Sequence, residues 1–316
     1  MLGVISLLAV AASVSQSAPP GKPVIRKLGT LDCDMVETTP MVFRGRLYRF
    51  EYVRSNYKPN ATGETYFRFI DVATGEATPA FAAGWHLGSA HVEGDRVYAY
   101  GVNAWGGSEI RVWWSEDLKT WSSQAALSLP GWQIYNTSVC KGDGRFVMAF
   151  EIGAPPEETG AAFTMRFAES SDLRDWKLTP AECVFAKDRY TACPALRFLD
   201  GFYYMIYLEA RPGPTYEPHI VRSRDLVSWQ PSPLNPLMQF SPQDKLIANP
   251  RLDAECRRRI AEAVNLNNSD LDLCEFDGKV VIYYSWGNQH GIEHLAEAVY
   301  KGTLADFLRG WFPRQD

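Results

Sequence analysis

The sequence predicts an all-β fold, a five-bladed β-propeller with a short helical insertion before the last blade. Two observations predict it: a turn motif that occurs three times, and five strand pairs of similar pattern. The motif Ser-x-Asp-Leu-x-x-Trp stands at Ser115–Trp121, Ser170–Trp176 and Ser223–Trp229, with its Asp residues 55 and then 53 residues apart. Self-similarity at such a period is typical of stacked or circular repeats, and this one has the size of a propeller blade.

The chemistry of the motif favours a tight turn followed by an anchor. Ser and Asp side chains accept hydrogen bonds from backbone N–H groups two or three residues further on, which closes the turn. The Trp then offers a large apolar surface to the neighbouring unit. We therefore expect Trp121, Trp176 and Trp229 at equivalent, largely buried places in three consecutive sheets.

Each of the five strand pairs has a Gly-containing turn between runs of β-branched or aromatic residues, the pattern of a hairpin. A third strand is expected after each pair, and the turn motif leads into a fourth. The pairs span 37–53, 86–101, 136–151, 191–209 and 268–285, and the third strands 66–72, 110–114, 163–169, 219–222 and 294–300. Residues 24–28 are expected to add a strand to the last blade and close the ring, which makes 24–316 a single domain.

The insertion covers 231–267 and contains an expected helix over Asp253–Val264. Its apolar residues recur at helical spacing, and we expect them to pack on the outside or rim of the ring. They are Leu252, Cys256, Ile260 and Val264. The Arg257–Arg259 run is expected to face solvent. In the last unit, 301–311 is expected to form a short helical turn in place of the motif.

Composition and the first residues indicate an exported protein. The 316-residue chain has a net charge of −5, which argues against a nucleic-acid partner because phosphate binding needs a basic patch. Leu2–Val14 is apolar, and the small residues Ser15–Ala18 follow it. This is the pattern of a signal peptide over 1–18, and the run is short for a bilayer span. We expect a secreted or periplasmic protein with no membrane span once the signal is removed.

The six cysteines show neither a C-x-x-C pair nor metal-finger spacing. Cys183 and Cys193 flank a loop, where an oxidising compartment would allow them to pair. Cys140 and Cys274 are expected to be buried in strands. No pair of histidines has the spacing of a transition-metal site, so no cofactor is required. A structural calcium ion in the central channel is compatible with a propeller, although nothing in the sequence requires one.

Candidate site residues follow from the topology. The first strand of a blade starts near the mouth of the central channel, and the second strand ends there, so polar residues at these places surround the axis. Strand starts supply Glu37, His86, Asn136, Tyr190, Asp270 and Asp272, and second-strand ends supply Glu51, Arg54, Glu151, Glu209 and Trp286. Trp85, Trp105 and Trp132 lie in loops and suit either blade packing or a sugar platform.

This assortment suits the hydrolysis of sugars. One carboxyl must stay protonated as the general acid, and a second must be ionised as base or nucleophile. We expect Glu37, Glu209 and Asp270 to share one pocket as the catalytic carboxyls, because ring closure makes the first and fifth blades neighbours and Glu209 comes from the fourth. The expected substrate-binding residues are Glu51, Arg54, His86, Asn136, Glu151, Tyr190, Asp272 and Trp286.

With five blades, the three turn motifs and a Pro after the start of inner strands, the sequence resembles the five-bladed propeller glycoside hydrolases of families 43, 32 and 117. The Asp box of sialidases has a Gly that all three motifs lack. The family 43 pattern places its general base in an Asp-Pro, where this sequence has Thr39-Pro40. Its acid Glu has no counterpart in the fourth blade, which has 191–194 as Thr-Ala-Cys-Pro.

The resemblance implies a carbohydrate substrate and, by analogy with family 43, an inverting hydrolase. The departures from the family pattern imply either relocated carboxylates or a relative that has lost hydrolysis. Two alternatives therefore stay open. One is a glycan-binding propeller without catalysis, and the other is a polysaccharide lyase that removes a proton next to a uronate carboxylate with His86, Tyr190 or Arg54.

Overall fold

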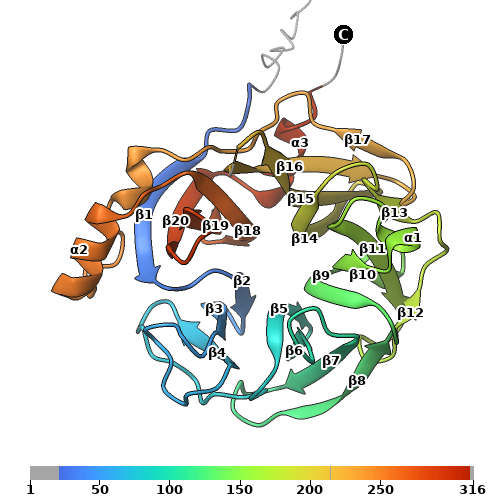
Figure 1. Ribbon diagram of the computed structural model, residues 1–316, viewed down its shortest axis with the longest axis horizontal. Coiled ribbons are helices and arrows are strands. Elements are labelled where there is room, and N and C mark those ends of the chain that lie inside the picture. Colours follow the sequence, from blue (N-terminus) through green and yellow to red (C-terminus); the bar gives the residue numbers. More distant parts are fainter. Residues whose placement is uncertain (1–20, 214, 314–316) are drawn as a thin grey trace, which may run out of the picture.

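The structure, a computed structural model, describes residues 21–213 and 215–313, and the expected signal peptide over 1–18 lies outside them. Five antiparallel sheets stand around a central axis as the blades of a propeller (Figure 1). This confirms the predicted fold class. In the described part of the chain, no helix is long and apolar enough to cross a membrane.

The blades follow one another along the sequence, and each begins with its innermost strand (Figure 1). Blade 1 has three strands, and the other blades have a fourth or more. Blade 1 consists of β2 (Thr38–Phe43), β3 (Arg46–Val53) and β4 (Tyr66–Asp71); blade 2 of β5 (His86–Glu93), β6 (Arg96–Val102), β7 (Glu109–Ser115) and β8 (Ser122–Ser128); blade 3 of β9 (Gln133–Gly142), β10 (Arg145–Ala154), β11 (Thr164–Ser170), β12 (Lys177–Leu178) and β13 (Val184–Phe185); blade 4 of β14 (Thr191–Leu199), β15 (Phe202–Arg211), β16 (Thr215–Ser223) and β17 (Trp229–Pro231); blade 5 of β18 (Asn267–Phe276), β19 (Lys279–Gly287) and β20 (Glu293–Lys301).

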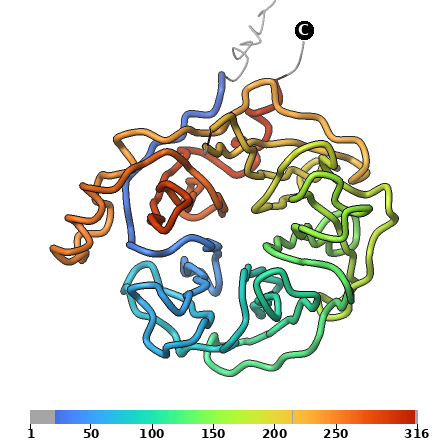
Figure 2. Tube along the Cα trace, viewed as in Figure 1, coloured from blue at the N-terminus to red at the C-terminus, as the bar shows by residue number. Residues whose placement is uncertain are grey.

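The ring is closed by its first strand. β1 (Arg26–Cys33) pairs antiparallel with β20 and completes blade 5 from the other end of the sequence. Figure 2 shows the blue N-terminal segment running beside the red blade before it enters blade 1. The expectation of a closing strand is thus confirmed, with the strand longer than 24–28.

The three turn motifs have the same geometry. In each, the Ser hydroxyl accepts the N–H of the Leu, at 2.9 Å for Leu118, 3.0 Å for Leu173 and 2.9 Å for Leu226. The Asp carboxylate accepts the N–H groups two and three residues further on, such as those of Lys119 and Thr120 at 2.8 Å. Each Leu has a φ between 61° and 68°, a conformation that costs a branched residue energy. Burial of the Leu side chains offsets that cost.

Each motif Trp packs on the preceding blade. Trp121 stacks on Phe81 with ring centroids 4.0 Å apart, Trp176 meets Tyr100 edge-on at 5.8 Å, and Trp229 stacks on Phe167 at 5.5 Å. The equivalence of the three places is confirmed. Trp176 is buried, whereas Trp121 and Trp229 are half-buried. The motif therefore joins neighbouring blades through aromatic contacts.

The insertion before blade 5 contains η1 (Pro242–Lys245) and α2 (Ala254–Glu262), and α3 (Leu304–Gly310) follows β20. A short α1 (Pro156–Thr159) lies in blade 3. α2 lies on the outside of the ring next to β1 (Figure 1). Its Cys256 and Ile260 are buried as expected, but Val264 is 54% exposed because it follows the end of the helix.

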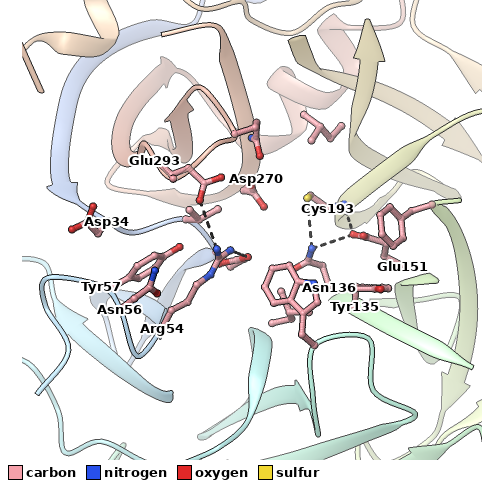
Figure 3. A pocket seen from close by; sticks show the side chains of 18 of the residues that line it. Asp34, Arg54, Asn56, Tyr57, Tyr135, Asn136, Glu151, Cys193, Asp270 and Glu293 are labelled. Carbon is pink, nitrogen blue, oxygen red and sulfur yellow. Dashed lines mark hydrogen bonds and ion pairs between the residues drawn. The ribbon is translucent and has the colours of Figure 1, made fainter. Parts of the chain in front are cut away.

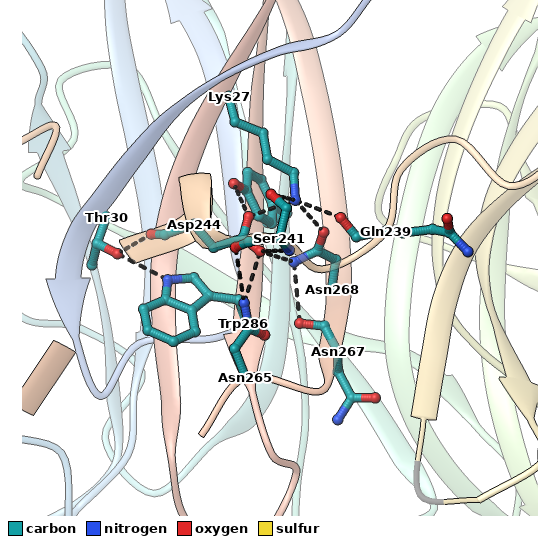
Figure 4. Close-up of polar contacts among 10 residues, drawn as sticks. Lys27, Thr30, Gln239, Ser241, Asp244, Asn265, Asn267, Asn268 and Trp286 are labelled. Carbon is teal, nitrogen blue, oxygen red and sulfur yellow. Dashed lines mark hydrogen bonds and ion pairs between the residues drawn. The ribbon is translucent and has the colours of Figure 1, made fainter. Parts of the chain in front are cut away.

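A buried polar network fixes the insertion to the closing strand (Figure 4). The Asp244 carboxylate, fully buried, accepts hydrogen bonds from Ser241, Asn265 and Tyr284 and forms an ion pair with Lys27 of β1 at 2.6 Å. The Lys27 ammonium also donates to Asn268 at 2.7 Å. Burial lowers the pKa of Lys27, and the Asp244 charge opposes this shift. A buried charge of this kind is tolerated because it is fully paired.

All six cysteines lie in the described residues, and each is free. Cys183 and Cys193 are therefore not paired in this structure. Cys140 is buried in β9, as expected, and Cys274 in β18 is half-buried.

Candidate active site

A cavity of about 650 Å³ opens at the channel mouth, where the first strands of the blades begin. Ligand pockets of this size are common in enzymes. Its polar lining combines carboxylates, arginines and amides, and its apolar lining is largely aromatic. The lining residues include Asp34, Glu37, Arg54, Asn56, Tyr57, Trp105, Tyr135, Asn136, Glu151, Phe163, Tyr190, Cys193, Arg259, Asp270, Gln289 and Glu293.

β-Bulges at the mouth orient this lining. In blades 2, 4 and 5 the ladder between the first and second strands shifts register where Leu87, Cys193 and Asp270 lie. All three have positive φ, between 48° and 53°, and all three line the cavity. A bulge inserts an extra residue and redirects the side chains beside it, and bulges are frequent next to active sites. The same backbone device thus turns one residue of each of these blades toward the axis.

Glu151, at the end region of β10, carries a strongly perturbed carboxyl. Its side chain is buried, and Oε2 accepts the Cys193 N–H at 2.9 Å and the Asn136 amide at 3.1 Å. The pKa of Glu151 is raised to about 7: burial raises it most, the charges of Asp270 and Glu37 add to the rise, and the two hydrogen bonds oppose it. A carboxyl with this pKa carries a proton for much of the time at neutral pH, as a general acid must.

Arg54 forms a bridge between two other carboxyls of the cavity. It donates to Glu37 at 2.5 Å and lies 3.7 Å from Glu293. Its guanidinium also lies about 5 Å from the ring centres of Tyr57 and Trp105. Burial raises the pKa of Glu293 to about 7, with Arg54 opposing and Asp270 adding to the shift. Arg54 is therefore held in one position by opposite charges and aromatic faces.

Asp270 lies between these two groups in Figure 3, with Glu293 and Arg54 on one side and Cys193, Asn136 and Glu151 on the other. Its Oδ2 accepts the Ser285 hydroxyl at 3.2 Å. Asp270 also borders a narrow second cavity that is lined by Thr38, Ser89 and Thr137 from the innermost strands. The carboxylate thus belongs to both cavities of the channel.

Of the eleven residues predicted from strand starts and second-strand ends, six line the cavity and five do not. Those that line it are Glu37, Arg54, Asn136, Glu151, Tyr190 and Asp270. The expectation that Glu209 shares this pocket is wrong. Both Glu209 oxygens accept Arg189, at 3.0 and 3.2 Å, and Oε2 accepts the Tyr207 hydroxyl at 2.8 Å. Leu208 lines the cavity in its place, because successive residues of a strand face opposite ways.

Four expected binding residues have other partners. Glu51 is fully buried between Arg49 and Arg68, at 2.7 and 2.8 Å. The His86 ring bonds the Tyr52 hydroxyl at 2.7 Å, and Leu87 reaches the cavity instead. The Trp286 indole, 1% exposed, donates to Thr30 at 2.9 Å. Asp272 borders the narrow channel and pairs with Arg197 at 2.6 Å. These residues support the blades rather than the cavity.

The sequence reasoning missed several lining residues. Glu293 begins β20, a third strand, and third strands start at the same mouth as first strands, so topology could have indicated it. Tyr57 and Asn56 follow β3 in a loop, and Phe163 precedes β11. Of the three loop tryptophans, Trp105 lines the cavity and is 56% exposed, whereas Trp85 and Trp132 pack against the core.

The insertion also reaches the mouth. Arg259 of α2 lines the cavity, so the expectation of a solvent-facing arginine run is wrong for this residue. Arg257 and Arg258 lie on the outer surface, exposed as expected. Across residues 21–213 and 215–313, no group of three or more His, Cys, Asp or Glu side chains is placed to hold a metal ion.

Solved structures share this architecture. The protein is similar to a structure described as a glycoside hydrolase, over 89% of its own length and 94% of that protein, with a TM-score of 0.59 at 17% identity. It is also similar to xylan β-1,4-xylosidase from Bacillus halodurans C-125, with a TM-score of 0.56 at 13% identity. That match covers 86% of this protein and 54% of the xylosidase.

A third similar structure is CoXyl43, a β-xylosidase/α-arabinofuranosidase of family 43 from a compost microbial metagenome, in complex with xylotriose. Its TM-score is 0.52 at 14% identity, over 87% of this protein and 95% of CoXyl43. At these identities the likeness establishes the fold, that of the five-bladed propeller glycoside hydrolases. No protein-family model matches the sequence, and no curated protein matches it.

Proposed function

We propose that the protein is a glycoside hydrolase in which Glu151 is the general acid and Asp270 the base or nucleophile. The observation that carries the proposal is that the carboxyls of Glu151 and Asp270 lie at the same channel mouth in different environments. Burial raises the pKa of Glu151 to about 7, while Asp270 lies across the axis with a hydroxyl donor at 3.2 Å. Two carboxyls with different environments are the requirement of glycosidic bond cleavage.

In this mechanism Glu151 donates its proton to the oxygen of the leaving group. Asp270 either activates a water on the other face of the sugar or attacks the anomeric carbon directly, depending on the separation between the two carboxyls. Glu37 and Arg54 hold hydroxyls of the sugar, and their mutual ion pair fixes their positions. Tyr135, Phe163 and Tyr190 form a continuous series of edge-on contacts, at 4.6 and 5.5 Å between centroids, that provides apolar faces for the ring.

The charges of the cavity favour a neutral sugar and a hydrolase over a lyase. A lyase must neutralise the carboxylate of a uronate, which needs a free cation. Arg54 is paired with Glu37 and Glu293, and Arg259 is paired with Asp34. These are the two arginines among the residues that line the cavity. Of the other two residues named for the lyase alternative, His86 bonds Tyr52, and burial raises the pKa of Tyr190, which disfavours it as a base. The apolar Leu2–Val14 further supports action outside the cytoplasm.

The test is a screen of purified protein against neutral and uronate-containing polysaccharides and aryl glycosides, read for new reducing ends and for unsaturated products. The proposal expects reducing ends from a neutral glycan. Binding without turnover would assign the protein to the glycan-binding alternative, favoured by Thr39 at the family's general-base position. Unsaturated products would contradict the hydrolase and support the lyase.

A further inference from the structure

The cavity extends well beyond the proposed reaction centre. In Figure 3 Glu151 and Asn136 lie at one end and Asp34 at the other, with Asp270 and Arg54 between them. The end with Asp34 is also lined by Asn56, Tyr57 and Arg259. A volume of about 650 Å³ exceeds what a single small ring needs. The second end is therefore room that one terminal sugar does not explain.

An ion pair from two distant parts of the sequence forms this second end. Asp34 follows β1 and has a φ of 54°. Both Arg259 terminal nitrogens bond the Asp34 carboxylate, Nη1 to Oδ2 at 2.9 Å and Nη2 to Oδ1. The Arg259 and Asp34 side chains are 31% and 14% exposed, so they are in reach of a ligand. Parallel bonds of this kind fix the plane of the guanidinium.

The helix that carries Arg259 is itself fixed. Asp253 caps α2 by accepting the Cys256 N–H at 2.8 Å. Lys58, in the loop after β3, reaches Asp253 at 2.7 Å and so ties the helix to blade 1. Cys256 and Ile260 anchor its inner face in the core. Since neither partner of the ion pair has to be ordered on binding, a ligand would lose little free energy by using them.

We propose that the Asp34–Arg259 pair is an outer subsite that binds the second sugar unit of a neutral oligosaccharide. The inference rests on the proposed function and adds to it the substrate class, a glycan of two or more units. A paired guanidinium and carboxylate together donate to and accept from sugar hydroxyls while presenting little net charge, which fits a neutral sugar. The insertion thus sets the chain-length preference of the site.

The test measures affinity by calorimetry for xylo- and arabino-oligosaccharides of one, two and three units, with wild type, Arg259→Met and Arg258→Met, each carrying Glu151→Gln so that the ligand is not cleaved during the titration. Arg258 is the matched control, because it lies next to Arg259 on α2, is 62% exposed and pairs with Glu262 at 2.9 Å on the outer surface. Wild type should bind two units at least about ten-fold more tightly than one. Arg259→Met should lose about ten- to a hundred-fold for two units, the effect of a hydrogen bond to a charged group, and nothing for one.

Arg258→Met should behave as wild type, and Arg259→Lys, which keeps the charge without the paired geometry, should fall between. Melting temperatures of all variants show whether α2 stays folded; if Arg259→Met unfolds, the Lys variant carries the test. A wild type that binds one unit as tightly as two, or equal losses in Arg259→Met and Arg258→Met, would overturn the inference while leaving hydrolysis intact. A length preference that Arg259→Met abolishes, in a protein that cleaves nothing, would uphold the subsite and reject the hydrolase.

Discussion

The Cys193 backbone N–H donates to Glu151 Oε2 at 2.9 Å, across the boundary between blades 4 and 3. Together with the Asn136 amide at 3.1 Å, it directs the carboxyl into the cavity. Two donors on a carboxylate normally lower its pKa. Burial prevails here and raises the pKa of Glu151 to about 7. The bulge that gives Cys193 a φ of 53° therefore helps to position the proposed acid.

Glu151→Gln keeps the shape of this side chain and removes its proton. We expect turnover to fall by about 10²–10⁴-fold, the usual contribution of general acid catalysis. Folding should be preserved, because Gln accepts the same N–H from Cys193. Steady-state kinetics with a melting curve check this, and Glu209→Gln is the control, since Glu209 pairs with Arg189 outside the cavity. Equal activity losses in the two variants would contradict the assignment.

Activity should depend on pH through the same group. Protonated Glu151 is required, so kcat should fall as the pH rises through about 7. The free energy of unfolding should also decrease as the pH rises. A carboxyl whose pKa is higher in the folded state than in the unfolded state stabilises the fold. This stabilisation is complete when the pH is below the pKa of the unfolded state, and it is lost as the pH rises through the pKa of the folded state. Glu293, with a pKa of about 7, acts in the same direction.

The matching measurement is the melting temperature of wild type and Glu151→Gln at a pH of about 5 and of about 8, on either side of the Glu151 pKa. The variant lacks the buried charge, so its melting temperature should fall less between the two values than that of wild type. The raised pKa would be contradicted if, from the lower to the higher pH, the melting temperature of wild type rose relative to that of the variant.

Ring closure should depend on the buried pair between Lys27 and Asp244. Removing one partner leaves the other charged and buried, so Lys27→Met or Asp244→Asn should cost about 3–5 kcal/mol. Lys58→Met breaks the partly exposed pair with Asp253 and should cost about 1 kcal/mol or less. Chemical denaturation compares the three. Equal costs at the buried and the exposed pair would show that the network does not hold the closing strand.

The motif tryptophans should differ in their contribution to stability. Trp176→Ala should cost about 3–5 kcal/mol, the range for a large buried side chain, because Trp176 is buried and its indole donates to Leu173 at 3.2 Å. Trp121 is half-buried, and Trp121→Ala should cost less. Denaturation curves measure both, and a larger loss at Trp121 would mean that its stack on Phe81 outweighs burial.

The fold was accessible from the sequence because its determinants are local. The Ser and Asp of each motif bond backbone groups within three residues, and the turn between the first and second strand of every blade contains Gly. The closing strand could be inferred as well, since a ring leaves one blade incomplete. The turn signals do not depend on the packing between distant segments, and the closing strand follows from the blade count.

The site was accessible only in part because bulges shift the side chains near the mouth. The position of His86 at the start of a strand predicts that its side chain faces the cavity, whereas the bulge turns Leu87 there instead. In β15 the sequence predicts Glu209 at the cavity, but the residue that lines it is Leu208, one position earlier and on the opposite face of the strand. Arg259 belongs to an insertion whose position on the rim depends on Lys58 and Asp253. Neither bulges nor long-range tethers leave a periodic signal in one sequence.

The most direct measurement of the central claim compares leaving groups. For the sugar that the screen selects, kcat/KM is measured on aryl glycosides with dinitrophenol and with unsubstituted phenol, using wild type and Glu151→Gln. Dinitrophenol departs without a proton, so the variant should keep nearly full activity on that substrate and lose about 10²–10⁴-fold on the phenyl glycoside. Equal losses on both substrates, or none on either, would contradict Glu151 as the general acid.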